Sequence, residues 1–155
     1  PFISGERSLG WHGEAHMTIA GIGRNTSPAE LLRAGMEALA YQLTMVYEQI
    51  CGALNVKHGK PKVIGSGGAL LGSTLLKSIL ADTLATPLYP SRDHEASARG
   101  ATLLALEALG VIPDLAHVSP NLDEPTLPDD ERGKHYRQAM ERQRKLYELL
   151  LGPLT

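Results

Sequence analysis

Apolar side chains recur every three or four residues between residues 28 and 51, a spacing that predicts a long amphipathic helix. Ser27, Pro28 and Glu30 mark its start, because serine caps the helix, proline suits its first position and glutamate completes a capping box. Gly52 is expected to end the helix. The predicted buried face consists of the recurring apolar residues, which are Leu32, Met36, Leu39, Leu43, Val46 and Ile50.

Short apolar runs alternate with the helical patterns that follow. Residues 62–64 (Lys-Val-Ile) and 88–89 (Leu-Tyr) read as strands, and a helix carrying Leu71, Leu75, Ile79 and Leu80 lies between them. Further helices are predicted over residues 95–109, stopped by Gly110, and over about 130–151. The order α, β, α, β, α predicts an α/β domain. Because two strands are too few for a stable sheet, the early strands are expected upstream of Pro1.

Two stretches lack helical periodicity. Residues 1–23 hold five glycines, which predicts loops and one short strand at residues 17–20. Residues 111–128 carry four prolines and scattered acids, so they are predicted to form an extended surface connection. The periodic stretch beyond them is interpreted as a docking helix with a charged, solvated face.

Composition excludes several classes of function. The 155 residues are 43% hydrophobic, which suffices for one core, and the net charge of -2 includes no basic run for a nucleic-acid backbone. No stretch approaches the roughly 20 apolar residues of a membrane span. Cys51 is the single cysteine, so the chain is expected to be cytoplasmic. Because the chain starts at Pro1 without methionine or signal peptide, we expect it to belong to a longer protein.

The glycine-rich stretch from Gly65 to Thr74 is the strongest chemical signal, because glycines at a strand-to-helix junction leave the backbone bare for a ligand. A Walker A loop fits the glycine spacing, but Ser73 stands where lysine is required. A dinucleotide fingerprint would need glycine at Leu70. Two interpretations stay open: an adenosine-contact turn of the kind found in actin-like ATPases, and a purely structural turn.

Several motifs in order carry a family resemblance. Residues 1–11 (PFISGERSLGW), 21–23 (GIG) and 29–41 (AELLRAGMEALAY) resemble the C-terminal domain of the FGGY carbohydrate kinases. The order continues through residues 66–69 (SGGA), 79–82 (ILAD) and 96–101 (ASARGA). The resemblance covers about residues 1–110 well and the terminal helix loosely.

The resemblance implies a ribonuclease H-like, actin-type ATPase fold in which two domains close on ATP and a sugar. Residues 1–110 are then the nucleotide-binding core, 111–128 a proline-rich connection and 129–155 a docking helix. Gly68 and Gly72 match nucleotide-contacting positions, with Gly67 and Ala69 shaping the turn. The implied cofactors are ATP and Mg²⁺.

The catalytic residues of this family, an aspartate base and a threonine-bearing phosphate loop, precede the matched stretch. No residue here inherits a catalytic role, and the stretch alone is expected to be inactive. Residues 5–8 and 96–101 resemble the gluconate kinase branch, so gluconate is the favoured substrate. Xylulose kinase, another polyol or ketose kinase, and an inactive nucleotide-binding or interaction module are the alternatives. The expected partners are a sugar or sugar acid and the protein's own N-terminal domain, and a homodimer stays open.

Other polar residues are given structural interpretations. Asp82 and Glu95 are expected to be surface or capping residues. Glu6, Arg7 and Trp11 resemble the family's loop that leads toward the interdomain cleft, where a structural ion pair is favoured and a substrate contact is the alternative. The glycine between His12 and His16 argues against a helical metal pair, and no metal site is predicted. The small residues at the start of the next helix are expected to let it pack behind the glycine turn; they are Ala96, Ser97, Ala98, Gly100 and Ala101.

Overall fold

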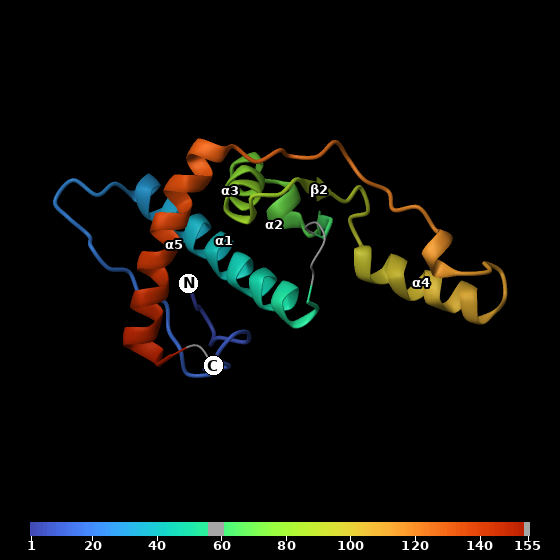
Figure 1. Cartoon of the computed structure of the whole chain (residues 1–155), viewed down its shortest axis with the longest axis horizontal. Coiled ribbons are helices and arrows are strands. Elements are labelled where there is room, and N and C mark those ends of the chain that lie inside the picture. Colours follow the sequence, from blue (N-terminus) through green and yellow to red (C-terminus); the bar gives the residue numbers. More distant parts are fainter. Residues whose placement is uncertain (56–60, 154–155) are drawn as a thin grey trace.

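The computed structural model describes residues 1–55 and 61–153 and shows a mixed arrangement of helices and strands (Figure 1). The long helix α1 (Pro28–Ala53) packs beside α3 (Thr74–Leu84), and α5 (Asp130–Leu151) packs against both. A two-stranded parallel sheet lies on α3 through its second strand. The α/β class is confirmed, and so are the helices expected over residues 28–51, 95–109 and 130–151.

Helix α1 begins as its sequence predicts. The Ser27 hydroxyl accepts a hydrogen bond from the Glu30 backbone N–H, and the Glu30 carboxylate accepts one from the Ser27 N–H at 2.8 Å, so both halves of the capping box are present. The predicted end is wrong by two residues. The helix continues through Gly52 to Ala53, and Leu54 caps it.

The predicted buried face of α1 is also wrong. Leu32, Leu39, Leu43 and Ile50 are exposed by 42–66%, while Met36 and Val46 are half-buried. The face that packs on α3 and α5 instead presents Ala40, Tyr41, Thr44 and Met45. Because this face includes small and polar residues, the pattern of apolar residues in the sequence did not indicate its burial. The helix therefore carries two packing faces, of which the more apolar one has no cover within the described residues.

Both predicted strands are present and parallel. Strand β1 (Val63–Gly65) pairs with β2 (Leu88–Pro90), with Val63 opposite Leu88 and Gly65 opposite Pro90. The outer edge of β2 is covered by the proline-rich stretch, through antiparallel bridges from Leu88 to Thr126 and from Ser91 to Leu122. That stretch therefore does more than connect two helices, because its second half pairs along the sheet.

One expected helix is broken in two. Helix α2 (Gly68–Leu71) ends at Gly72, and Ser73 caps α3, so Leu71 belongs to a separate turn from Ile79 and Leu80. The short strand expected at residues 17–20 is absent, since no neighbouring strand lies beside this segment to pair with it.

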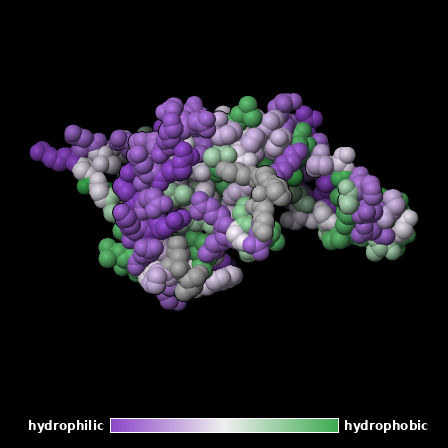
Figure 2. Space-filling model, in the orientation of Figure 1, coloured by the Kyte–Doolittle hydropathy of each residue, from purple (hydrophilic) through white to green (hydrophobic). Residues whose placement is uncertain are grey.

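Helix α4 (Ala96–Ala108) ends just before Gly110, whose φ of 71° suits the helix stop that the sequence predicts. It contacts the short 3-10 helix η1 (Leu115–His117) and stands apart from the other helices (Figure 1). The expected packing behind the glycine turn is wrong for the chain as described, because α4 contributes no buried residue. Apolar side chains of α4 and of the residues just after it, among them Leu104 and Leu109, are therefore exposed at the surface (Figure 2).

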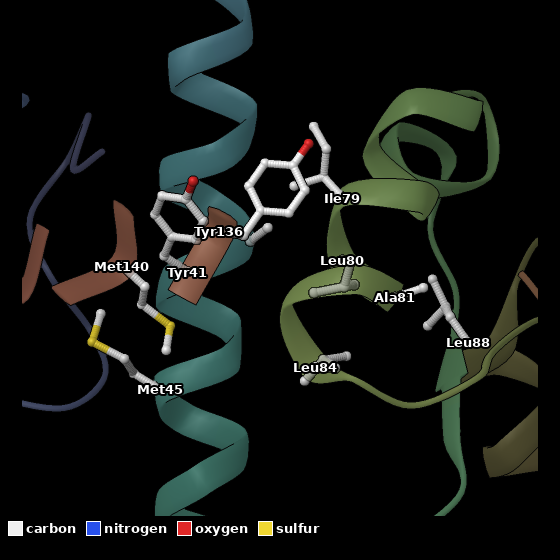
Figure 3. Close-up of a cluster of buried hydrophobic side chains, with 10 residues drawn as sticks. Tyr41, Met45, Ile79, Leu80, Ala81, Leu84, Leu88, Tyr136 and Met140 are labelled. Atoms are coloured by element: carbon white, nitrogen blue, oxygen red, sulfur yellow. The ribbon is translucent and has the colours of Figure 1, made fainter. Parts of the chain in front are cut away.

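The core lies where α1, α3 and α5 meet, and Leu88 extends it to the sheet (Figure 3). Tyr41 and Tyr136 face each other with ring centroids 6.2 Å apart, and Met45 and Met140 lie beside them. The α3 side of this core consists of Ile79, Leu80, Ala81 and Leu84. Burying this set drives the three helices together.

Polar contacts hold the start of α5 on α3. Asp82 is 1% exposed, and its carboxylate accepts from the Asp129 backbone N–H at 2.7 Å and from Arg132 Nε at 2.7 Å. The surface or capping role expected for Asp82 is therefore wrong, because the helix pattern did not reveal that α5 begins against it. Gly133 lets the backbones approach, since a Cβ there would lie 3.0 Å from the Asp82 carbonyl oxygen.

We predict that acidification destabilises the fold through two helix caps. A backbone hydrogen bond lowers the pKa of Glu30 in the cap of α1, and another lowers the pKa of Asp129 in the cap of α5. The stability that these groups contribute is present above their unfolded pKa values and is lost as the pH falls through the lowered folded values. Urea unfolding at pH 7 and pH 3 should show lower stability at pH 3, with a smaller difference for Asp129→Asn. Equal differences in wild type and variant would contradict this.

Candidate functional site

The glycine-rich turn lies at the carboxyl end of β1. It runs from Gly65, the last residue of β1, to Thr74, the first residue of α3. Ligands of open α/β sheets bind outside the carboxyl ends of parallel strands, so this position is where a ligand is expected. The turn is also exposed between Ser66 and Ala69.

Two of its glycines are required by the protein itself. A Cβ on Gly65 would lie 2.5 Å from Leu70 Cδ2 and 3.3 Å from Leu88 Cδ1, so glycine there lets α2 close on the sheet. Gly67 has a φ of 94°, a backbone conformation that residues with a Cβ rarely adopt. These two positions explain the sharp reversal of the chain.

Gly68 differs from these two because no contact within the described chain demands glycine. A Cβ built there meets nothing within 4 Å, and the residue is exposed beside Ala69. Gly68 is the first residue of α2, and the described chain gives no packing reason for glycine there. The bare backbone at Gly68 and Ala69 therefore leaves room for an outside group to approach closely.

Gly72 is tied into α2. Its N–H donates to the Gly68 carbonyl at 2.9 Å, and a Cβ would lie 3.0 Å from that same oxygen. Glycine at position 72 is thus explained by the close turn that joins α2 to α3. Its backbone N–H is already used inside the protein.

Ser73 is engaged in the same way. Its hydroxyl accepts from the Leu76 N–H at 3.1 Å and caps α3. The next turn contributes Lys77, whose ammonium donates to the Leu71 carbonyl at 3.4 Å and closes the α2–α3 junction. Lys77 was missed from sequence, and its spacing of four residues from Ser73 is the signal that would have placed it beside the turn.

A second polar cluster follows β2 at the same edge of the sheet. The Ser91 hydroxyl accepts from the Asp93 N–H at 3.1 Å, and the Asp93 carboxylate pairs with Arg99 at 3.2 Å. Asn121 also donates to Asp93 at 3.3 Å. The sequence pattern points to Arg99 only as part of the 96–101 motif and to none of the others. Their signal is a serine and an aspartate directly after a buried strand, next to the glycine turn in the sheet.

The Glu6 carboxylate is buried away from this edge. It accepts from the Gly10 N–H at 3.2 Å, the His12 N–H at 3.1 Å and the Tyr147 hydroxyl at 3.2 Å. The structural role expected for Glu6 holds, but the expected ion pair with Arg7 is wrong within the described residues, because backbone N–H groups solvate this charge instead. Burial, with Glu6 beside it, raises the pKa of Tyr147 to about 12.

The remaining candidates do not gather into a site. Glu95 occupies the cap position of α4 without a side-chain cap bond. Across residues 1–55 and 61–153, no group of three or more His, Cys, Asp or Glu side chains is arranged to hold a metal ion, and His58 lies outside the described residues. In the same part of the chain, none of the helices combines the length and the apolar character needed to cross a bilayer.

Residues 1–109 match the model of the FGGY family of carbohydrate kinases, C-terminal domain. The chain belongs to this family. Glycerol kinase 1 of Thermotoga maritima is 28% identical over an alignment of 131 residues that covers 81% of this chain and 26% of that protein. Glycerol kinase of Acidiphilium cryptum is 30% identical over an alignment of 142 residues that covers 88% of this chain and 28% of that protein. This FGGY chain therefore spans about a quarter of the length of these curated relatives.

Solved structures show the same fold. The gluconate kinase of Lactobacillus acidophilus aligns with 97% of this chain and 30% of that chain, at a TM-score of 0.82 and 20% identity. The alignment with the ligand-bound xylulose kinase of Lactobacillus acidophilus covers 99% of this chain and 31% of that kinase, at a TM-score of 0.83 and 20% identity. The FGGY chain thus has the fold of the corresponding part of these kinases.

Proposed function

We propose that the intact protein transfers the γ-phosphoryl group of ATP to a hydroxyl of a sugar, sugar acid or polyol. Residues 1–110 form its nucleotide-binding core, 111–128 the connection along the sheet and 129–155 the docking helix. One side of the nucleotide site is formed by the glycine turn, through Gly67, Gly68, Ala69 and Gly72. Strands elsewhere in the polypeptide complete the ribonuclease H-like topology.

The bare backbone at Gly68 is the observation that carries the proposal. No contact within the described chain requires glycine at position 68, whereas close contacts or a positive φ require it at Gly65, Gly67 and Gly72. An adenosine moiety laid against Gly68 and Ala69 would supply that reason, because a flat base needs close approach to the backbone. The turn also stands at the carboxyl end of a parallel strand, where nucleotides bind in α/β folds.

The division of labour follows from the chemistry of phosphoryl transfer. Catalysis consists mostly of positioning and charge neutralisation, with Mg²⁺ bridging the phosphates when ATP is bound. We assign the described residues the adenosine end, because the exposed backbone at Gly68 and Ala69 offers close approach to a flat base. The proton-accepting carboxylate and the sugar pocket belong to the remainder of the intact protein. A cytoplasmic location fits a kinase that draws on ATP and a chain with one cysteine.

The substrate class is a small polyhydroxylated carbon chain. The named sequence relatives are glycerol kinases, whereas the named structural neighbours are gluconate and xylulose kinases. Gluconate, favoured by the resemblance of residues 5–8 and 96–101, stays a prediction, with xylulose and other polyols as its alternatives. These names share one acceptor chemistry, a hydroxyl on a flexible polyol chain.

Gly68→Val should weaken nucleotide binding to the intact protein at least tenfold, about 1.4 kcal/mol, because its methyl groups occupy the space proposed for the base. The structure predicts little effect on folding, since a Cβ at this position meets nothing within 4 Å. Calorimetric titration with ATP measures the affinity, and thermal melting measures the fold. Unchanged ATP affinity in the folded variant would overturn the assignment.

Ser73→Ala is the matched control in the same turn. Loss of the α3 cap should cost about 1 kcal/mol of stability, while ATP affinity and turnover stay near wild type. A large loss of turnover in a folded Ser73→Ala protein would instead favour a phosphate-binding loop, in which Ser73 stands at the lysine position beside the phosphates.

A further inference from the structure

The carbonyl group at the end of α2 is only weakly hydrogen-bonded by the protein itself. The neighbouring Leu70 carbonyl accepts from the Ser73 backbone N–H at 3.2 Å. Within the described residues, the Leu71 carbonyl is paired instead with the Lys77 ammonium, at 3.4 Å. That distance is longer than the about 2.7–3.2 Å of an ordinary N–H···O bond. The Leu71 carbonyl can therefore accept a second, shorter hydrogen bond.

Lys77 is a cation that has no carboxylate partner in the described part of the chain. It is the fourth residue of α3 and is half-buried, yet among residues 1–55 and 61–153 it forms no ion pair. Asp82 is the one acid on the same helix, and it pairs with Arg132. An ammonium group has three N–H donors, and the bond to Leu71 uses one of them. The other donors can contact a ligand.

This donor and this acceptor lie beside the backbone that is proposed to contact adenosine. Gly68 and Leu71 are the first and last residues of α2, so they are three positions apart and lie on the same side of one helical turn. One turn of helix rises only about 5 Å. The turn is exposed at residues 66–69 and again at Gly72. A flat base lying on the bare backbone at Gly68 therefore brings one of its edges near Leu71 and Lys77.

A hydrogen-bond acceptor next to a donor is complementary to an edge of adenine. Adenine carries the N6 amino donor beside a ring-nitrogen acceptor, whereas guanine has the O6 acceptor in place of the amino group. The Leu71 carbonyl can accept from N6 while the Lys77 ammonium donates to the neighbouring ring nitrogen. Lysine by itself would favour guanine, because it can donate to both O6 and N7. The carbonyl therefore decides the selectivity, since guanine would set O6 against it.

We propose that Lys77 and the Leu71 carbonyl form the base-recognition pair of the nucleotide site and select adenine over guanine. The inference rests on the proposed function, because it requires a nucleotide on the glycine turn. It adds a side chain that contacts the base to a turn that otherwise contributes backbone. Lys77 is then a specificity-determining residue, and its role differs from that of the Walker A lysine, whose position Ser73 occupies.

The test combines a variant of the intact gene product with altered bases. Wild-type protein should bind ATP at least about tenfold more tightly than GTP. It should also bind either 7-deaza-ATP or 1-deaza-ATP about tenfold more weakly than ATP, because each analogue lacks one of the two ring nitrogens beside the amino group. Lys77→Met keeps a long side chain but removes the donors, so it should bind ATP and that analogue equally well. Calorimetric titration measures each affinity.

Lys62→Met is the matched control. Lys62 immediately precedes β1, at the opposite end of that strand from the glycine turn, and its ammonium lies 4.1 Å from the centroid of the Tyr89 ring. Its removal takes away the same charge as Lys77→Met, yet the ratio of the ATP and deaza-ATP affinities should stay at the wild-type value.

Three results would overturn the inference. The first is wild-type protein that binds GTP as tightly as ATP, and the second is wild-type protein that binds both deaza analogues as tightly as ATP. The third is weaker binding of an analogue that persists in Lys77→Met, because a purely structural lysine would alter stability and leave this ratio unchanged. Each of these leaves ATP binding and the proposed function standing. A folded intact protein that binds no ATP would overturn both.

Discussion

Asp82→Ala should lower the free energy of unfolding by about 3 kcal/mol, the range found when one partner of a buried ion pair is removed. Asp82 is buried on α3, while its partners Asp129 and Arg132 lie at the start of α5. The substitution leaves the Asp129 N–H without its acceptor and releases the helix from the core. Urea unfolding followed by circular dichroism measures the loss.

Lys134→Ala is the matched control, because Lys134 lies on the same helix, within one turn of Arg132. Lys134 pairs with Glu131 at 2.5 Å, but both side chains are exposed, so its removal should cost less than about 1 kcal/mol. Arg132→Ala should fall between the two, because half of the Arg132 side chain faces solvent. Equal losses of unfolding free energy for Asp82→Ala and Lys134→Ala would show that the contacts of Asp82 do not hold α5 in place.

Glu6→Ala should cost about 2–3 kcal/mol, because it leaves buried donors without an acceptor. The Glu6 carboxylate joins three parts of the fold: the N-terminal loop through Gly10 and His12, α1 through Gln42 Nε2 at 3.5 Å, and α5 through Tyr147. Glu6→Gln should not restore full stability, since the new NH₂ group faces donors. Thermal melting ranks the variants.

Tyr147→Phe distinguishes the contribution of the Glu6 carboxylate from that of the one hydrogen bond donated by the Tyr147 hydroxyl. It removes one of the Glu6 donors and keeps the ring beside Phe2, so it should cost about 1 kcal/mol. A Tyr147→Phe protein as unstable as Glu6→Ala would mean that the hydroxyl, and not the carboxylate, organises this corner of the molecule.

Local signals in the sequence predicted the elements well. The capping box at Ser27, the stop at Gly110 and the limits of α5 each follow from a few neighbouring residues, and the structure has all three. The two strands were also found, because β-branched or apolar runs bounded by proline and glycine form compact signals. Such features depend on the chain near them and hold whatever the rest of the protein contains.

Features that depend on distant partners were not predictable. The apolar stripe of α1 indicated burial, yet the helix packs through Ala40, Tyr41 and Thr44 on α3 and α5. A pattern shows that a face is apolar but not which element covers it. Asp82 looked like a surface acid for the same reason, since its partners lie 47 and 50 residues along the chain.

The glycine turn falls between these two cases. Its position after a strand was readable from sequence, but four glycines in eight residues looked alike there. Three-dimensional contacts distinguish them, because Gly65 meets Leu70, Gly67 has a positive φ, Gly72 meets its own helix and Gly68 meets nothing. The roles of Gly67, Gly68, Ala69 and Gly72 toward a nucleotide stay predictions.

Release of ADP by the intact gene product is the measurement that checks the proposed kinase activity. With Mg-ATP and a panel of gluconate, xylulose, ribulose, glycerol and related polyols, we expect release with one substrate far above the others. Gly68→Val should reduce that release at low ATP and recover much of it at high ATP. No release across the panel, from a folded protein that binds ATP, would rule out the proposed kinase activity and favour a nucleotide-binding module without it.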